Sequence, residues 1–151
     1  MSQSDDQTEI FKQAVTATMK AISGNEELSV SFGRGKAYIQ GNRARIPLPD
    51  KNAGISESEL AVLRGTSDKF ALNARFHDEA DHRKNRPEAG VSQEVFDFVE
   101  EARVAAIGSY LMRGVQDNLG AELEQHCIDK GYDTVVNQED SPLGEAVGFY
   151  I

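Results

Sequence analysis

Residues 28–49 read LSVSFGRGKAYIQGNRARIPLP, and their periodicity differs from that of the rest of the chain. Leu28, Val30 and Phe32 alternate with serines, which is the two-residue period of a half-buried β-strand. Glycine-containing turns then separate this run from two further short extended stretches, at 37–39 and 43–46. The segment Pro47-Leu48-Pro49 forces an extended backbone and ends the run. The sequence therefore predicts a small antiparallel β-meander over about residues 28–46.

Helical periodicity lies on both sides of the predicted meander. Before it, apolar residues recur at helical spacing from Thr8 to a stop at Gly24, and residues 1–6 are expected to form a flexible tail. After it, Ser56 and Glu59 carry the spacing of a capping box, which marks the start of a helix. The helices expected after the meander cover residues 56 to about 83, 92 to about 113, and 115 to about 130. The predicted fold class is α+β, mostly helical, in a single domain spanning residues 1–151.

The composition excludes several classes of function. The chain has 151 residues and a formal net charge of -9, which opposes binding to nucleic acid or to an anionic membrane surface. Its one cysteine, Cys127, favours a reducing compartment, and no apolar run approaches the length of about 20 residues that a membrane span requires. The acidic first ten residues do not resemble a signal peptide. A cytoplasmic location without nucleic-acid or membrane partners is therefore expected.

Residues 75–84, RFHDEADHRK, form the stretch richest in side chains that could carry chemistry, and they include two of the three histidines. If this stretch is helical, His77 pairs with Asp81 and Asp78 pairs with His82, each at i,i+4. His77, Asp78 and His82 are candidate metal ligands, although histidines five residues apart point in different directions on an ideal helix. The alternative is a solvated polar face whose charges pair with one another. No catalytic residue and no cofactor-binding residue is assigned, because the chain has neither a phosphate-binding loop nor a dinucleotide fingerprint.

Cations and aromatic side chains supply the candidate contacts for a protein partner. Arginine and aromatic residues are the usual anchors of protein interfaces. The candidates are Arg43, Arg45, Arg64 and Phe76. The alternative for each is an internal ion pair or core packing.

Several short motifs resemble those of one known protein family and occur in the same order along the chain. The stretch 41–49, GNRARIPLP, resembles the segment GN-x-AR-[LI]-P-x-P of that family. Arg64-Gly65 with Asp68 resembles RG-x-x-D, and the stretch from Ala71 to His82 resembles AL…HD-x-x-x-H. Residues 100–108 are similar to E-x-AR-V-E-x-x-G, and residues 112–119 to M-x-GV-x-x-NL. The departures are Ala105, in place of an acidic residue, and Asp81, in place of an apolar one.

These motifs together resemble the N-terminal region of the cobaltochelatase subunit CobT, and the resemblance implies a specific role. Members of that family work with a AAA+ ATPase subunit, CobS, and a large catalytic subunit, CobN, to insert Co(II) into hydrogenobyrinic acid a,c-diamide. The resemblance implies that ATP with Mg and Co(II) belong to the complex rather than to this chain, and that the complex contains ring-type oligomers. The C-terminal von Willebrand factor A domain of the family, with its adhesion-site metal, has no counterpart in these 151 residues.

Three hypotheses follow. The first is an assembly module that docks on the AAA+ subunit and has no active site of its own. The second is a metal-dependent hydrolase that uses His77, Asp78 and His82. The third is a domain that contacts the cobalt or the corrin directly as a delivery device.

Overall fold

The structure is a computed structural model, in which residues 3–48, 55–137 and 142–150 are described. A first helix and three strands are followed by five further α-helices, with one turn of 3-10 helix before the last of them. The elements are α1 (Gln3–Ser23), β1 (Ser29–Gly33), β2 (Tyr38–Gln40), β3 (Arg43–Pro47), α2 (Glu57–Phe76), α3 (Glu79–Asn85), α4 (Val91–Leu111), α5 (Arg113–Asp129), η2 (Tyr132–Thr134) and α6 (Leu143–Tyr150). The predicted class, mostly helical α+β, is confirmed.

The sheet lies where the sequence places it, but its topology is mixed and the predicted antiparallel meander is wrong. The strand order is β1-β3-β2, with β3 parallel to β1 and antiparallel to β2. The turn at Gly41 is tight and has a positive φ of 54°, so β2 and β3 pair as a hairpin. The longer segment after Gly33 instead carries the chain past the central position to the far edge. The alternation of apolar and polar residues in a strand is the same whichever strand lies beside it. The sequence pattern therefore does not reveal the order of the strands.

The two faces of the sheet differ in polarity. Along β3, Ala44 and Ile46 are fully buried, whereas the alternating Arg43 and Arg45 are exposed. The buried face joins one apolar cluster to which α1, α2, α4 and α5 also contribute. The buried members of that cluster are Phe11, Val15, Met19, Ile22, Leu28, Ala44, Ile46, Leu63, Ala71, Leu72, Val104 and Val115.

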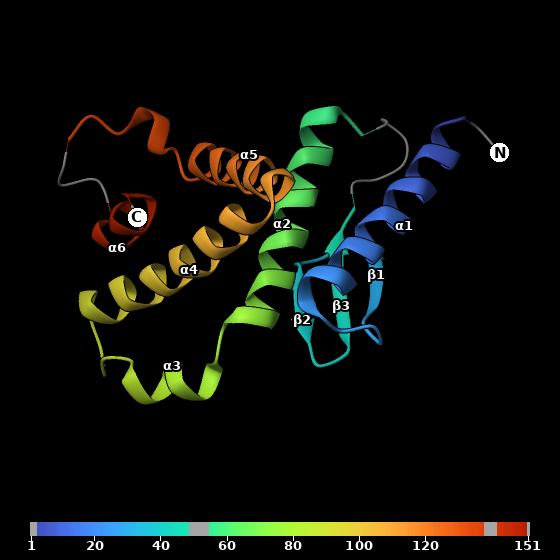
Figure 1. Cartoon of the computed structure of the whole chain (residues 1–151). Coiled ribbons are helices and arrows are strands. Elements are labelled where there is room, and N and C mark those ends of the chain that lie inside the picture. Colours follow the sequence, from blue (N-terminus) through green and yellow to red (C-terminus); the bar gives the residue numbers. More distant parts are fainter. Residues whose placement is uncertain (1–2, 49–54, 138–141, 151) are drawn as a thin grey trace.

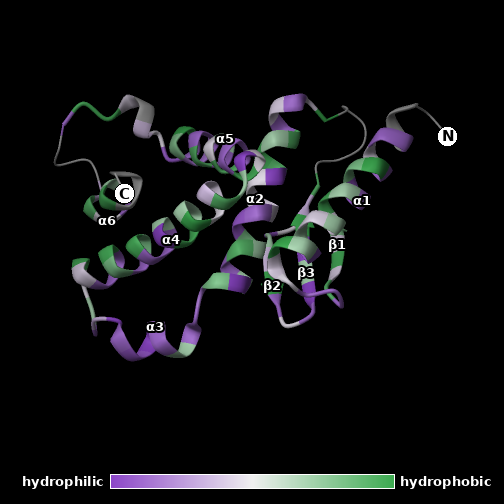
Figure 2. Cartoon of the chain, in the orientation of Figure 1, coloured by the Kyte–Doolittle hydropathy of each residue, from purple (hydrophilic) through white to green (hydrophobic). Residues whose placement is uncertain are grey.

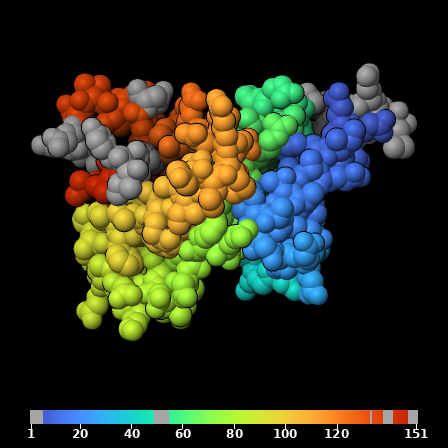
Figure 3. Space-filling view, viewed as in Figure 1, coloured from blue at the N-terminus to red at the C-terminus, as the bar shows by residue number. Residues whose placement is uncertain are grey.

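Helix α2 runs through the middle of the structure. In Figure 1, α1 and the sheet lie on one side of it and α4, α5 and α6 on the other. The space-filling view shows the same division, with the blue N-terminal part beside the yellow and orange helices (Figure 3).

Glycines allow the helices to approach closely. A Cβ on Gly65 of α2 would overlap the carbonyl oxygen of Asn118 on α5, and one on Gly108 of α4 would overlap the side chain of Leu72.

Three predicted helix boundaries are wrong. Helix α1 already begins at Gln3 rather than near Thr8, and acidic side chains such as Asp6 suit the first turn of a helix. Residues 1 and 2 of the expected tail lie outside the described residues. The predicted long helix ends at Phe76, and the chain turns before α3. Helix α4 starts at Val91, one residue before the predicted start, with Gly90 as its N-cap. The predicted start at Ser56 is confirmed, because its side chain and that of Glu59 form both bonds of a capping box.

None of the helices in the described ranges has the length and apolar composition that crossing a membrane requires.

Candidate functional site

The predicted site residues His77, Asp78 and His82 lie where the chain bends between α2 and α4, and Figure 2 shows helix α3 in this bend as strongly hydrophilic. His77 has an extended backbone (φ -95°, ψ 129°) and is the C-cap of α2. Asp78 is the N-cap of α3, and its Oδ1 accepts hydrogen bonds from the backbone N–H groups of Ala80 and Asp81, at 2.9 and 3.0 Å. This local capping replaces the continuous helix that the sequence predicts, because a capping aspartate satisfies donors at a new helix start.

The predicted i,i+4 pairs within one helix are therefore wrong, and both histidines pair with helix α4 instead. His77 Nδ1 lies 2.9 Å from Glu100 Oε1, and its Nε2 lies 3.3 Å from Glu79 Oε2. His82 Nε2 lies 2.9 Å from Asp97 Oδ1. Because Asp97 and Glu100 are three residues apart on α4, they lie on one face of that helix.

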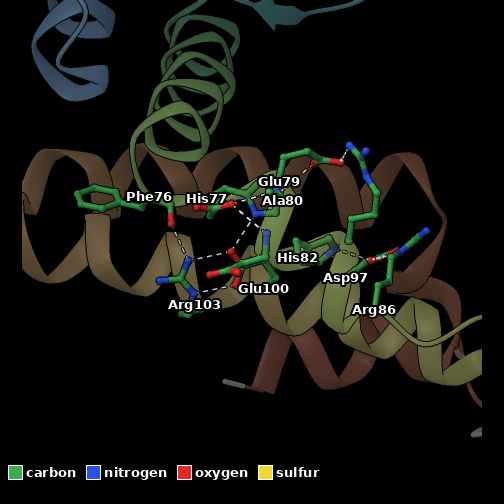
Figure 4. A network of polar contacts seen from close by, with 12 residues as sticks. Phe76, His77, Glu79, Ala80, His82, Arg86, Asp97, Glu100 and Arg103 are labelled. Atoms are coloured by element: carbon green, nitrogen blue, oxygen red, sulfur yellow. Dashed lines mark hydrogen bonds and ion pairs between the residues drawn. The ribbon is translucent and has the colours of Figure 1, made fainter.

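Two arginines complete this network of polar contacts (Figure 4). Arg103 donates to both oxygens of Glu100, at 2.7 and 2.8 Å, and also to the carbonyl oxygen of Phe76 at 2.7 Å. That carbonyl belongs to the last turn of α2, so a charged donor satisfies one of its unpaired acceptors. Arg86 forms a two-pronged ion pair with Asp97, in which Nε lies 2.6 Å from Oδ1. We name His77, His82, Arg86, Asp97, Glu100 and Arg103 the hinge network.

Ion pairing shifts the pKa values of side chains in the hinge network. The hydrogen bonds from Arg103 above all, and then the one to His77, lower the pKa of Glu100 to about 2. The bond to Glu100 in turn raises the pKa of His77, with a smaller contribution from Glu79. Arg86 is the main cause of the lowered pKa of Asp97. Each ionised carboxylate therefore stabilises the cation that it contacts, and each cation stabilises its carboxylate. Through these contacts the hinge network joins α3 and the end of α2 to α4.

The two histidine rings lie close together, with centroids 4.9 Å apart, yet their nitrogens face carboxylates of different residues. Within residues 3–48, 55–137 and 142–150, no group of three or more His, Cys, Asp or Glu side chains is arranged to hold a metal ion. Metal binding by His77, Asp78 and His82 stays a prediction.

A second polar contact joins α2 to α5. Asp68 is buried, with 2% of its surface exposed, and its Oδ2 accepts a hydrogen bond of 2.8 Å from the side-chain amide of Asn118. Burial raises the pKa of Asp68, against the opposing effects of Asn118 and Arg64. The Asp68 bond lies on the same helix pair as Gly65, where the helices are closest. The sequence pointed to Gly65, Asp68 and Asn118 only as parts of motifs and did not show that they meet.

The residues predicted to contact a protein partner lie in different environments. Arg43 and Arg45 lie on the exposed face of the sheet, and the guanidinium of Arg45 lies 5.7 Å from the centre of the Tyr38 ring. Arg64 instead lies over the ring of Phe11 on α1, at 5.6 Å. Phe76 is partly buried against the core, and Arg75 lies over its ring at 5.4 Å. Arg43 and Arg45 thus present themselves to solvent, whereas Arg64 and Phe76 make contacts inside the fold.

Sequence reasoning missed Asp97 as a partner of His82. Nothing in the sequence distinguishes it from the many other acidic residues, because a contact between residues 15 apart depends on how α3 folds back. Glu100 and Arg103, three residues apart, could be recognised as a pair on one face of a helix. Only the structure shows that Arg103 also donates to the end of α2.

This geometry defines a class of mostly helical α+β module whose motif residues join neighbouring helices through close glycine contacts and polar contacts. A family model described as cobalamin biosynthesis protein CobT matches residues 5–151. The chain therefore belongs to the CobT family, and this membership implies involvement in cobalamin biosynthesis. No solved structure matches the chain.

Proposed function

We propose that this chain is an assembly module of an ATP-dependent cobaltochelatase, the complex that inserts Co(II) into hydrogenobyrinic acid a,c-diamide. In this proposal it acts with a AAA+ ATPase subunit of the CobS type and a catalytic subunit of the CobN type. ATP with Mg is used by the ATPase, Co(II) is the substrate, and the assembled complex contains ring-type oligomers. The observation that carries the proposal is the family match over residues 5–151.

The arrangement of the motif residues supports an assembly role. Gly65, Asp68 and Asn118 hold α2 against α5, and His77 and Glu100 hold the end of α2 against α4. Residues used in this way give a fold with defined helix angles, which is what a preorganised docking surface needs. A rigid module also binds without a large cost in conformational entropy.

The test is co-elution with the partner ATPase. The purified chain is mixed with the CobS-type subunit from the same source, with and without ATP, and analysed by size-exclusion chromatography with light scattering. The proposal expects a joint peak whose mass exceeds that of the ATPase alone. Separate elution under every nucleotide condition, in the presence of the CobN-type subunit as well, would overturn it.

A further inference from the structure

The exposed face of the sheet is a polar surface with a regular arrangement of side chains. The strand register places Arg43 between Ser29 on β1 and Gln40 on β2, and Arg45 between Ser31 and Tyr38. All six residues are exposed, while their neighbours along each strand are at least partly buried. We name Ser29, Ser31, Tyr38, Gln40, Arg43 and Arg45 the arginine face.

The arginine face is positively charged in a chain that is otherwise acidic. Residues 28–49 contain Arg34, Lys36, Arg43 and Arg45 but no Asp or Glu, although the whole chain has 25 acidic residues. A Cβ added to Gly35 would lie 3.8 Å from Nη1 of Arg45, so this guanidinium reaches toward the loop that carries Lys36. The charge of Lys36 therefore adds to that of the face.

Over the residues that the structure describes, no carboxylate forms an ion pair with Arg43 or with Arg45. Glu27 lies near one end of the face, where it accepts a hydrogen bond from Asn42. The guanidinium donors of both arginines are therefore available to an anionic partner.

From this geometry we infer that the arginine face binds an extended acidic segment of a partner protein. Two residues of one strand that are two positions apart lie about 6.7 Å from each other, and this applies equally to a bound extended peptide. Carboxylates at alternate positions of that peptide thus match Arg43 and Arg45 one to one. Planar guanidinium groups bind carboxylates through two parallel hydrogen bonds. Ser29, Gln40 and the hydroxyl of Tyr38 supply neutral polar contacts on either side.

A short acidic segment fits the face better than a nucleic acid does. The few carboxylates of such a segment lie close to the two guanidinium groups of Arg43 and Arg45. Their attraction to these groups exceeds their repulsion from the acidic residues elsewhere on the chain, because salt screens charges that are far apart. A nucleic acid presents a long row of phosphates, and these extend past the face to the rest of a chain with net charge -9. The inference rests on the proposed docking role, and it adds the chemistry of the segment that docks.

The probe is a fluorescein-labelled peptide in which four acidic residues alternate with threonine, titrated with the full chain and followed by fluorescence anisotropy. A second peptide of the same composition carries its acids as two adjacent pairs separated by two threonines, so that no two acids are two positions apart. The variant is Arg43→Gln with Arg45→Gln. The matched control is Arg83→Gln with Lys84→Gln, which removes the same charge from exposed positions on α3.

We expect the alternating peptide to bind severalfold more tightly than its paired isomer, and the R43Q/R45Q variant to lose about tenfold or more in affinity at moderate salt. The R83Q/K84Q control should change affinity by less than about threefold. The single change Arg43→Gln, with the circular dichroism melt of each variant, separates lost binding from lost folding.

Equal binding by R43Q/R45Q and by the control would overturn the inference, as would the absence of any peptide binding. Tighter, arginine-dependent binding of a labelled single-stranded oligonucleotide would overturn the choice of occupant. Peptide binding by the isolated chain is measured separately from co-elution with the ATPase. A failure of the peptide test with intact co-elution therefore removes only the arginine face, whereas the reverse result removes the cobaltochelatase role.

Discussion

Exchange of Glu100 for glutamine tests whether the hinge network stabilises the fold through charge. Glutamine keeps the shape of the side chain but removes the charge that Arg103 and His77 contact. The pKa of Glu100 falls from 4.5 to about 2, and each pKa unit corresponds to about 1.4 kcal/mol. The full shift is thus worth about 3 kcal/mol. Because Arg103 is 47% exposed and solvent screens its charge, we expect the E100Q variant to lose about 2 kcal/mol of unfolding free energy.

The sign of the pH dependence follows from the two shifted groups. The folded pKa of Glu100 is lowered, so its contribution is fully present above its unfolded value of 4.5 and is lost as the pH falls toward 2. The folded pKa of His77 is raised, so its contribution is fully present below its unfolded value of 6.5 and is lost as the pH rises through the folded pKa. The effect of E100Q is therefore largest between pH 4.5 and 6.5.

The assay is urea unfolding followed by far-ultraviolet circular dichroism at about pH 3, 5.5 and 8. The control is Glu101→Gln. Glu101 is the next residue on α4, is 53% exposed and lies 3.3 Å from Lys69, so its loss should cost less than about 1 kcal/mol. An E100Q effect of equal size at all three pH values, or one no larger than that of E101Q, would refute a charge-based role for the hinge network.

Substitutions at Gly65, Asp68 and Ser56 test the contacts between and within helices by the same unfolding assay. Gly65→Ala should lower the unfolding free energy by at least about 2 kcal/mol, because the added Cβ overlaps the backbone of α5. Gly120→Ala, where a Cβ meets nothing within 4 Å, should raise it by about 0.5–1 kcal/mol. Similar effects of the two substitutions would contradict the close approach of α2 to α5 at Gly65. Asp68→Asn should be neutral or slightly stabilising at neutral pH, since burial makes the ionised form of Asp68 costly. Asp68→Ala should lower the unfolding free energy by about 1–3 kcal/mol, because it leaves the amide of Asn118 without its acceptor. Equal losses in the two variants would argue against a stabilising hydrogen bond between Asp68 and Asn118. Ser56→Ala should cost about 1 kcal/mol through loss of the capping box, and no change would mean that the helix start is stabilised elsewhere.

Local patterns in the sequence determined the fold class and most of the elements. The alternation of Val30 and Phe32 with serines gave strands, and the spacing from Ser56 to Glu59 gave the start of α2, because backbone geometry and capping depend on residues a few positions apart. The family motifs also came from the sequence, and they contain several of the residues that the structure shows to join the helices, among them Gly65, Asp68 and Glu100.

Contacts between distant residues were decided only by the tertiary structure. Strand periodicity does not specify which strands are neighbours, so the parallel pairing of β1 with β3 was missed. A continuous helical pattern also hid the bend at His77 and Asp78, where capping of α3 and pairing with Glu100 outweigh helix propensity. Asp68, Asn118, Asp97 and Glu100 acquire their roles from partners that are 15 to 50 residues away along the chain. Such roles depend on how whole helices pack, and packing is set by the buried surface of the complete chain rather than by any local stretch of it.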